Sequence, residues 1–279
     1  MIKCIFTNIK NEHRYLDEWI KYHIKIGFNK FILYEDEGSR SHDNIISKYN
    51  DIVDIDLYNY ILGNDNPEFK DLTCFKHIWN NYTDIDWLIK LDPDEYISFN
   101  SGLNTIDDYI YSLPSEVEQS LIPWRIYNAN GYIHSPSEGI YNLNDTYTSY
   151  IKDDDMDHSF NINTSTNGYL LSKAFIKYKN FKKDFLTELD EVNLSFAFPH
   201  QIFENCNTLV ENTIFIKHFI TKSFEEFLYR LQEKGEYLKG FERKLGDFFI
   251  INPDMQKDIP FIEKEFGINI ANIKTKLNK

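Results

Sequence analysis

The first hundred residues alternate between short apolar runs and amphipathic segments, and this alternation constrains the fold more than any other feature. Residues 16–27 repeat apolar side chains at helical spacing, and Gly27 is placed to end that helix. Strands that alternate with helices predict an α/β fold with a mostly parallel central sheet flanked by helices. The apolar runs that are typical of strands span residues 2–7, 31–34, 52–57 and 87–91.

The rest of the chain continues without a composition that would mark a linker. Residues 118–128, 168–178 and 209–219 are expected to be extended. Ser223 and Glu226 have capping-box spacing, which predicts a helix that ends at Gly235. We therefore expect one domain over residues 1–221, with a C-terminal helical extension over residues 222–279 packed on it.

Composition excludes several classes of protein. The 279 residues contain 30 Lys and Arg against 44 Asp and Glu, a net charge of −14 that disfavours binding to nucleic acid. No apolar run reaches the roughly 18 residues of a membrane span, and the N-terminus turns polar too early for a secretory signal. Cys4, Cys74 and Cys206 are too scattered for a disulfide framework, so we expect reduced thiols and a cytoplasmic protein. No sequence feature predicts an oligomeric state.

The strongest local motif is Asp92-Pro93-Asp94-Glu95, which directly follows the apolar run 87–91. In open α/β sheets, ligands bind at the carboxyl ends of strands. Three carboxylates within four residues repel one another unless a cation lies among them. Hard oxygen ligands suit Mg²⁺ or Mn²⁺, and such a metal could hold a diphosphate. The alternative interpretation is a solvated acidic turn.

Three blocks of this sequence resemble glycosyltransferases of the family 92 and family-2-like group, which have the GT-A (Rossmann-like) fold. The first block runs from Lys10 to Phe28 and contains Glu12, Trp19 and His23. The second comprises residues 34–36 and 87–96, and the third begins at His218. The blocks occur in the family's order and cover close to half of the chain.

The resemblance implies transfer of a sugar from a nucleotide diphosphate sugar to a hydroxyl acceptor, a glycan or a protein, with inversion. It implies that Mn²⁺ or Mg²⁺ is bound by Asp92, Asp94 and His218. The nucleoside contacts that it implies come from Thr7, Glu12 and one of Glu35 and Asp36. A strand-end histidine bonded to backbone is the alternative for His218.

Other candidates follow from residue type and position. Residues 172–183 hold five lysines and no acid, which could neutralise a diphosphate, and the resemblance favours Lys173 for that contact. A solvated lysine-rich face is the alternative. Inverting transfer needs a carboxylate base, for which Glu95 and Asp190 are candidates. The candidates for contacts with the acceptor are Trp124, Asn130, Gly131 and His200.

Two other functions stay open. Haloacid-dehalogenase-type phosphatases also place Asp-x-Asp after a strand, but they resemble this chain only there and expect Thr or Val where Tyr96 stands. The second is a non-catalytic sugar-nucleotide-binding protein on the same scaffold, which no residue excludes.

Overall fold

In the computed structural model the chain divides into two compact units. Unit 1 comprises Met1–Trp124 and Asn161–Lys217, and unit 2 comprises Arg125–Phe160 and His218–Lys279. The boundaries predicted from the sequence, 1–221 and 222–279, stay a prediction. The structure describes residues 1–60, 70–100, 102–136, 143–150, 172–180, 208–210, 213–232, 237–238, 241–242 and 245–270.

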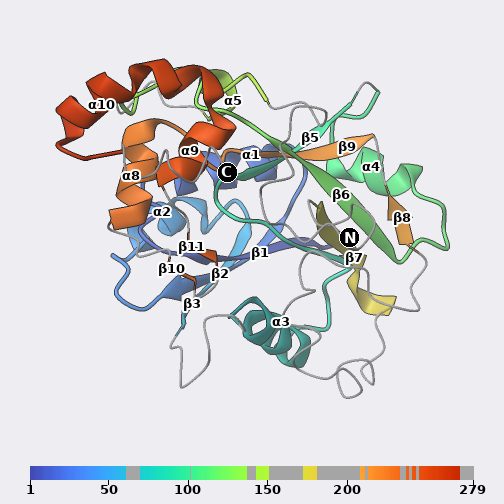
Figure 1. Ribbon diagram of the computed structural model, residues 1–279. Coiled ribbons are helices and arrows are strands. Elements are labelled where there is room, and N and C mark those ends of the chain that lie inside the picture. The colour runs from blue at the N-terminus through green and yellow to red at the C-terminus, as the bar shows by residue number, and fades with distance from the viewer. Residues whose placement is uncertain are drawn as a thin grey trace. The chain divides into compact units, whose positions relative to one another are not determined.

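Unit 1 is built on a sheet of order β3-β2-β1-β4-β7-β6-β9-β5, with β8 paired to β6 (Figure 1). Strand β1 pairs in parallel with β2 and β4, and β2 pairs in parallel with β3. Strand β7 runs antiparallel to both β4 and β6. The predicted α/β fold is confirmed, with its parallel part at β3-β2-β1-β4. The strands are β1 Lys3–Ile9, β2 Lys30–Asp36, β3 Asp54–Tyr60, β4 Trp87–Lys90, β5 Glu95–Phe99, β6 Gln119–Ile126, β7 Ser172–Lys177, β8 Thr208–Val210 and β9 Ile214–His218.

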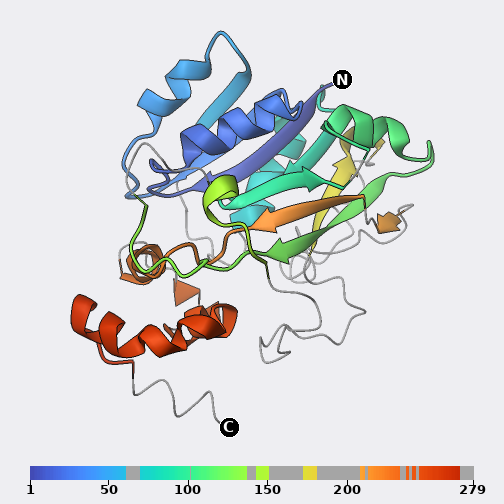
Figure 2. The same cartoon turned by 90° about the horizontal axis from the view of Figure 1, so that it is seen from above.

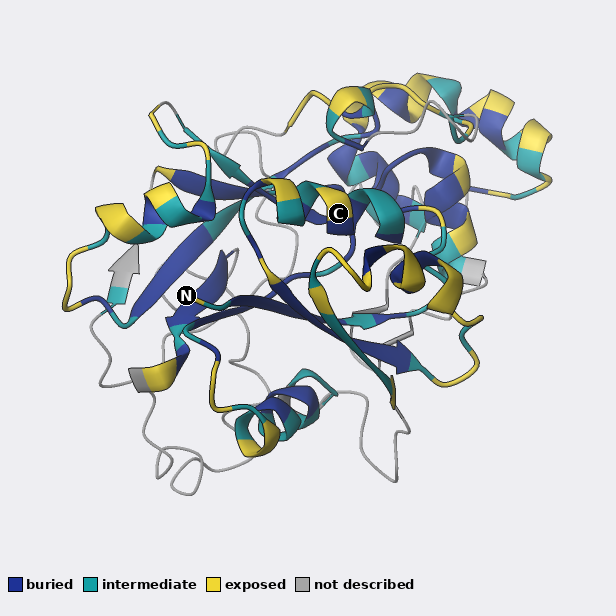
Figure 3. Ribbon diagram, turned by 180° about the vertical axis from the view of Figure 1, so that it is seen from behind, coloured by how far each residue is buried: buried dark blue, intermediate teal, exposed yellow. Residues whose placement is uncertain are grey.

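Helices cover both faces of this sheet. In α1 (Leu16–Lys25), Trp19 packs on Phe31 of β2, with ring centroids 5.8 Å apart. In α3 (Lys70–Asn81), Phe75 joins a buried cluster with Ile32 of β2. Because neighbouring residues of a strand point to opposite faces, α1 and α3 lie on opposite sides of the sheet, as Figures 1 and 3 show. Shorter helices are α2 (Asp43–Ile46), η1 (Ser47–Tyr49), α4 (Ile106–Ser112) and η5 (Tyr178–Asn180).

Two local predictions in unit 1 are confirmed. The first helix ends before Gly27, which has a φ of 107°, a value that suits glycine. Strands β1, β2 and β4 are buried over nearly their whole length (dark blue in Figure 3), as continuous apolar runs predict. Strand β1 continues to Ile9, two residues beyond the end predicted from the sequence.

Unit 2 is mainly helical in its described part (Figure 2). The capping box is confirmed, because Glu226 N–H donates to Ser223 Oγ and Ser223 N–H donates to Glu226 Oε2, both at 3.3 Å. Phe224 and Phe248 belong to a buried hydrophobic cluster. The predicted stop at Gly235 lies outside the described residues. The elements are α5 Leu143–Thr146, α8 Phe224–Gln232, β10 Tyr237–Leu238, β11 Phe241–Glu242, α9 Leu245–Ile251, η6 Pro253–Asp258 and α10 Ile259–Phe266.

Within the described segments, no helix has the length and apolar content that crossing a bilayer requires.

Candidate functional site

The carboxyl ends of β1, β2 and β4 meet at one edge of unit 1, because the three strands are parallel neighbours. Glu35 and Asp36 end β2, and Asp92 lies two residues beyond the end of β4. Parallel pairing therefore brings acidic groups that are far apart in the sequence to the same edge.

Two buried lysines bind the carboxylate of Asp92. Lys90 Nζ donates to Asp92 Oδ1 at 2.5 Å, and Lys173 Nζ donates to Oδ2 at 3.1 Å. The side chains of Lys90 and Lys173 are 7% and 1% exposed, whereas that of Asp92 is 36% exposed. Lys90 belongs to β4 itself, and Lys173 belongs to its antiparallel neighbour β7. The partly exposed carboxylate thus lies over two buried ammonium groups.

These ion pairs belong to a longer series of alternating charges. Lys90 Nζ is also 3.4 Å from Asp71 Oδ2, in the first turn of α3. Asn8 Nδ2 donates to the other oxygen of Asp71 at 2.7 Å. At the other end of the series, Lys173 Nζ is 3.4 Å from Glu95 Oε1. The series therefore connects β1, α3, β4, β7 and β5.

The charges in this series shift the pKa values of its members. Burial alone would raise the pKa of Asp92, but Lys173 and Lys90 hold it well below its usual value. Burial would lower the pKa of Lys90, but Asp71 and Asp92 raise it above the usual lysine value. Burial raises the pKa of Glu95 to about 8, against the lowering effect of Lys173. Lys90 and Lys173 thus offset the negative charge of Asp92, while burial disfavours the charged form of Glu95.

This balance bears directly on the predicted metal. Clustered carboxylates need a bound cation when no other positive charge is near, whereas here two lysines place positive charge at both oxygens of Asp92. A dication on Asp92 would lie beside two ammonium groups that repel it. Among the described residues, no group of three His, Cys, Asp or Glu side chains is placed to hold a metal ion. In this arrangement the residues around Asp92 do not fit a metal.

Glu95 closes the turn that carries Asp92. Glu95 N–H donates to Asp92 O, and Asp92 N–H donates to Glu95 Oε2, both at 2.9 Å. Trp19 Nε1 donates to Glu95 O at 3.0 Å, which anchors the turn on α1. Glu95 is fully buried, and its Oε2 is held by the backbone of the turn itself. Glu95 therefore stabilises the turn that carries Asp92.

The two acids at the end of β2 differ in their partners. Glu35 Oε1 lies 2.5 Å from His42 Nδ1, so Glu35 is engaged within the protein. Asp36 Oδ2 accepts from Lys70 Nζ, while Asp36 Oδ1 is buried and has no hydrogen-bond partner among the described residues. A buried carboxylate oxygen without a donor is unfavourable by about 1–3 kcal/mol or more. Asp36 therefore has a buried acceptor that a ligand could satisfy, while His42 contacts only Oε1 of the two Glu35 oxygens.

The other residues predicted to contact the nucleoside lie on β1 and after it. Thr7 is fully buried inside β1, and its hydroxyl donates to Asn8 O at 3.3 Å. Glu12 lies in the turn between β1 and α1, where its backbone N–H donates to His42 Nε2 at 2.9 Å. Glu12 thus lies beyond the carboxyl end of β1, and Thr7 does not.

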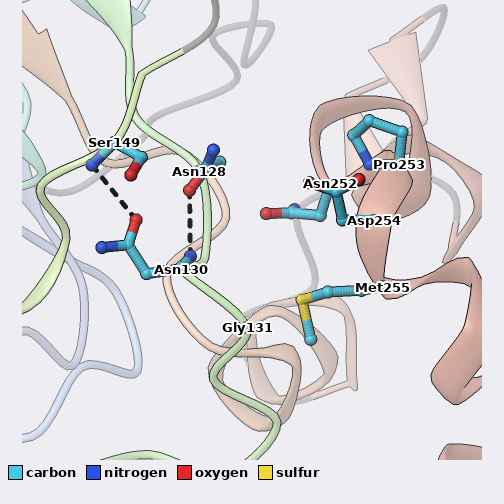
Figure 4. A pocket seen from close by; sticks show the side chains of 8 residues that line it. All are labelled: Asn128, Asn130, Gly131, Ser149, Asn252, Pro253, Asp254 and Met255. Atoms are coloured by element: carbon cyan, nitrogen blue, oxygen red, sulfur yellow. Dashed lines mark hydrogen bonds between the residues drawn. The ribbon is translucent and has the colours of Figure 1, made fainter.

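Asn130 and Gly131 lie in unit 2 and line a cavity of about 310 Å³ (Figure 4). Both have left-handed backbone conformations, with φ values of 50° and 80°. Asn130 Oδ1 accepts from Ser149 N–H at 3.2 Å, and Asn130 N–H donates to Asn128 Oδ1 at 2.9 Å. Amide and hydroxyl groups therefore dominate one side of the cavity. The remaining lining residues are Asn252, Pro253, Asp254 and Met255.

Among the described residues, Trp124 and His218 are not part of the lining of that cavity. Trp124 belongs to unit 1, where Lys173 Nζ lies 5.3 Å from the centre of its ring. His218 ends β9 and is buried, and its carbonyl accepts from Tyr127 N–H at 2.9 Å. Asp190 and His200 lie outside the described residues.

Sequence patterns do not single out Lys90 and His42, although both take part in the arrangement at the sheet edge. Lys90 does leave a signal, because it interrupts an apolar strand directly before the acidic motif. A lysine in a buried strand needs an acidic partner. His42 lies in a polar loop with no distinguishing spacing, so its role becomes visible only in the structure.

The chain matches two curated plant proteins over about half of its length. It is 26% identical over 141 residues to a glycosyltransferase family 92 protein of Ricinus communis, covering 49% of this chain and 25% of that protein. It is 25% identical over 144 residues to one of Oryza sativa subsp. japonica, covering 49% and 23%. The chain resembles glycosyltransferase family 92 proteins. The resemblance inferred from the sequence motifs is confirmed, and the chain spans about a quarter of the length of these relatives. No protein-family model matches the chain.

Solved structures with a partly similar arrangement include S. aureus TarS 1-349, with a TM-score of 0.46 and 12% identity, covering 95% of this chain and 73% of that one. HddC from Yersinia pseudotuberculosis has a TM-score of 0.37 and 12% identity, covering 85% and 100%. A glycosyltransferase involved in the glycosylation of the major capsid of PBCV-1 has a TM-score of 0.34 and 10% identity, covering 81% and 97%.

Proposed function

We propose that this chain transfers a sugar from a nucleotide diphosphate sugar to a hydroxyl acceptor. The observation that carries the proposal is the convergence of the first two resembling blocks on one sheet edge. The turn after β1, the acidic end of β2 and the Asp92 turn after β4 come together through parallel pairing. That edge is the common place for ligands in open α/β sheets.

We assign the nucleoside contact to Asp36 rather than Glu35. One oxygen of Glu35 binds His42, whereas Asp36 has a buried carboxylate oxygen that receives no hydrogen bond from the described residues. A ribose hydroxyl or a base N–H has the chemistry to donate to that oxygen, and hydrogen bonds to charged groups are among the stronger ones. Glu12 belongs to the same edge through the turn that follows β1.

The proposed reaction is a single displacement at the anomeric carbon. The acceptor oxygen forms a bond to that carbon as its bond to the diphosphate oxygen breaks. The nucleoside diphosphate leaves with the electron pair, the acceptor proton passes to a base, and the configuration inverts. Glu95 is buried and its Oε2 accepts from Asp92 N–H within the turn, so it is poorly suited to be that base. Asp190 is the remaining candidate from the sequence.

We propose that the cavity in unit 2, taken by itself, binds a glycan. Asn128, Asn130 and Ser149 face Asn252 across this cavity (Figure 4). Amide and hydroxyl groups bind neutral, hydroxylated ligands, and a volume of about 310 Å³ falls within the range of small-molecule sites. The Asn252 carboxamide is fixed in place, because its oxygen accepts from Ala129 N–H at 2.5 Å and its nitrogen donates to Phe248 O at 2.8 Å.

A thermal-shift panel of nucleotide sugars tests the donor proposal. Ligand binding stabilises a protein by RT ln(1 + [L]/Kd), so at about 100 times Kd we expect at least one compound to raise the melting temperature by about 5 °C or more. Free nucleosides and free sugars at the same concentration are the controls. The absence of a shift with every nucleotide sugar would contradict the proposal.

The same panel, run with Mn²⁺ and with EDTA, tests the predicted metal. Because Lys90 and Lys173 already neutralise Asp92, we expect Mn²⁺ alone to leave the melting temperature unchanged. If a nucleotide sugar still raises the melting temperature in EDTA, the positive charge that balances the diphosphate comes from this chain's own lysines. If the nucleotide sugar raises the melting temperature only when Mn²⁺ is present, the result supports the metal site predicted from the sequence.

A further inference from the structure

His42 is completely buried between the segments that follow β1 and β2. Glu35 Oε1 accepts both the backbone N–H of His42, at 3.0 Å, and its ring Nδ1–H, at 2.5 Å. On the other side of the ring, Glu12 backbone N–H donates to Nε2 at 2.9 Å. A backbone N–H is always a donor, so Nε2 must be unprotonated. The ring is therefore neutral, with its one proton on Nδ1.

Further hydrogen bonds join the same two segments. Asn11 N–H donates to Ser39 Oγ, and Arg40 N–H donates to Asn11 Oδ1, both at 3.0 Å. His13 Nε2 donates to Ser41 O at 2.9 Å. Asn11 has a φ of 53°, a conformation that costs a non-glycine residue about 1 kcal/mol or more, so the turn depends on these contacts to keep its shape. We name Glu12, Glu35 and His42 together the His42 clamp.

A second proton on His42 is incompatible with the clamp. Protonated Nε2 would face Glu12 N–H, and two donors cannot form a hydrogen bond. Burial is the largest effect on the ring and lowers the pKa of His42. The Glu35 carboxylate and Glu12 raise it, while the ring of His13, stacked at a centroid distance of 4.2 Å, lowers it further. The net effect keeps the ring neutral as long as the clamp is closed.

We propose that His42 is a positioning residue for the donor edge: its neutral ring holds the turn after β1 against the end of β2, and its protonation releases that turn and weakens sugar-nucleotide binding. The first part of the proposal, that protonation of His42 releases the turn after β1, is argued from the hydrogen bonds of the His42 clamp. The effect on sugar-nucleotide binding rests on the proposed function.

The direction of the pH effect follows from linkage. The pKa of His42 is lower in the folded protein than the usual value of about 6.5, so the unfolded or open state binds the proton more readily. The stabilisation from the clamp is therefore fully present above about pH 6.5 and is lost as the pH falls below that value.

Hydrogen exchange followed by mass spectrometry tests the release without any ligand. In peptides covering residues 9–15 and 36–43, we expect protection, corrected for intrinsic exchange, to fall about ten-fold between about pH 7.5 and about pH 5.5. His42→Gln should abolish this dependence, because its amide oxygen can accept from Glu12 N–H and does not titrate. His42→Asn keeps a donor for Glu35 but is too short for Glu12, so it should lower protection at both pH values.

The matched control is His134→Gln, which removes an exposed histidine of unit 2 and should keep the wild-type pH dependence. A wild-type protein without pH-dependent exchange, or His42→Gln with the wild-type dependence, would overturn the proposal. If His42→Gln does not fold, Glu35→Gln replaces it. That variant keeps an oxygen for His42 but removes the charge that favours protonation, so the exchange midpoint should move to lower pH, and an unchanged midpoint would overturn the proposal.

Titration calorimetry with UDP and GDP at the two pH values tests the link to the donor edge. We expect affinity for the nucleotide that binds to fall about ten-fold at the lower pH in the wild type and to stay constant in His42→Gln. Constant affinity in the wild type, despite release of the turn, would overturn the positioning role. Normal pH-dependent exchange without binding of either nucleotide would count against the proposed function and would leave the clamp itself supported.

Discussion

Replacing Asp92 with alanine is expected to lower the free energy of unfolding by about 2 kcal/mol. The substitution leaves Lys90 and Lys173 buried without the carboxylate that both of them bind. Breaking a fully buried ion pair costs about 3–5 kcal/mol, and solvent screening reduces that figure here because Asp92 is 36% exposed. A surface metal ligand, as the sequence alone suggests for Asp92, would leave the fold intact when replaced.

Urea unfolding of three variants measures this effect. Asp92→Asn keeps one oxygen as an acceptor for one lysine, so we expect a loss of about 1 kcal/mol. Asp54→Ala is the control, because Asp54 pairs with the buried Lys30 but is 61% exposed, and Asp56 remains 3.2 Å from the same ammonium group. We expect a change within about 0.5 kcal/mol for Asp54→Ala. An Asp92→Ala variant as stable as the wild type would contradict the structural role of Asp92.

Replacing Asp36 with alanine is expected to weaken sugar-nucleotide binding by about 10- to 100-fold. The reason is the buried carboxylate oxygen of Asp36, to which we assign a nucleoside group and for which the described part of the chain supplies no donor. A hydrogen bond to a charged group contributes about 1.5–3 kcal/mol, and each 1.4 kcal/mol corresponds to a factor of ten in affinity. Titration calorimetry with the nucleotide sugar that gives the largest thermal shift measures the change.

Asp54→Ala is again the matched control for this experiment. Asp36 and Asp54 each accept from a lysine, but Asp36 ends β2 at the carboxyl edge, whereas Asp54 begins β3 at the opposite edge. We expect Asp54→Ala to bind the donor like the wild type. Equal affinity of Asp36→Ala and the wild type would contradict the assignment of Asp36 and would return Glu35 to consideration.

The parallel half of the fold could be predicted because the signals for its strands and helices lie within short stretches of the sequence. The apolar run of β4 and the helical spacing of α1 each specify one element and its buried face. Gly27 and the pair Ser223 and Glu226 mark helix boundaries through backbone conformation and capping bonds within a few residues. Each of these signals lies inside a short window of sequence.

The arrangement of charges at the site could not be predicted, because it depends on strand pairing between distant segments. Lys173 reaches Asp92 from 81 residues away, and this contact exists only because β7 pairs antiparallel to β4. The acidic motif taken alone has an excess of negative charge, and this excess predicts a bound metal ion. The folded chain supplies two cations there, and one of them, Lys90, comes from the strand that leads into the motif.

The same limitation applies to the choice between Glu35 and Asp36. The two residues are neighbours with similar chemistry, so sequence alone gives no reason to prefer either. The structure separates them, because His42 binds one oxygen of Glu35 while Asp36 has one buried oxygen to which no described residue donates.

The most direct test of the central claim is a transfer assay with the nucleotide sugar that stabilises the protein most and a panel of glycan acceptors. Nucleoside diphosphate release and the mass of the acceptor are measured together. We predict one sugar added per nucleoside diphosphate released, with both signals strongly reduced in Asp36→Ala and unchanged in Asp54→Ala. Tight binding of the nucleotide sugar with neither nucleoside diphosphate release nor a change in acceptor mass would contradict the account and would identify a binding protein.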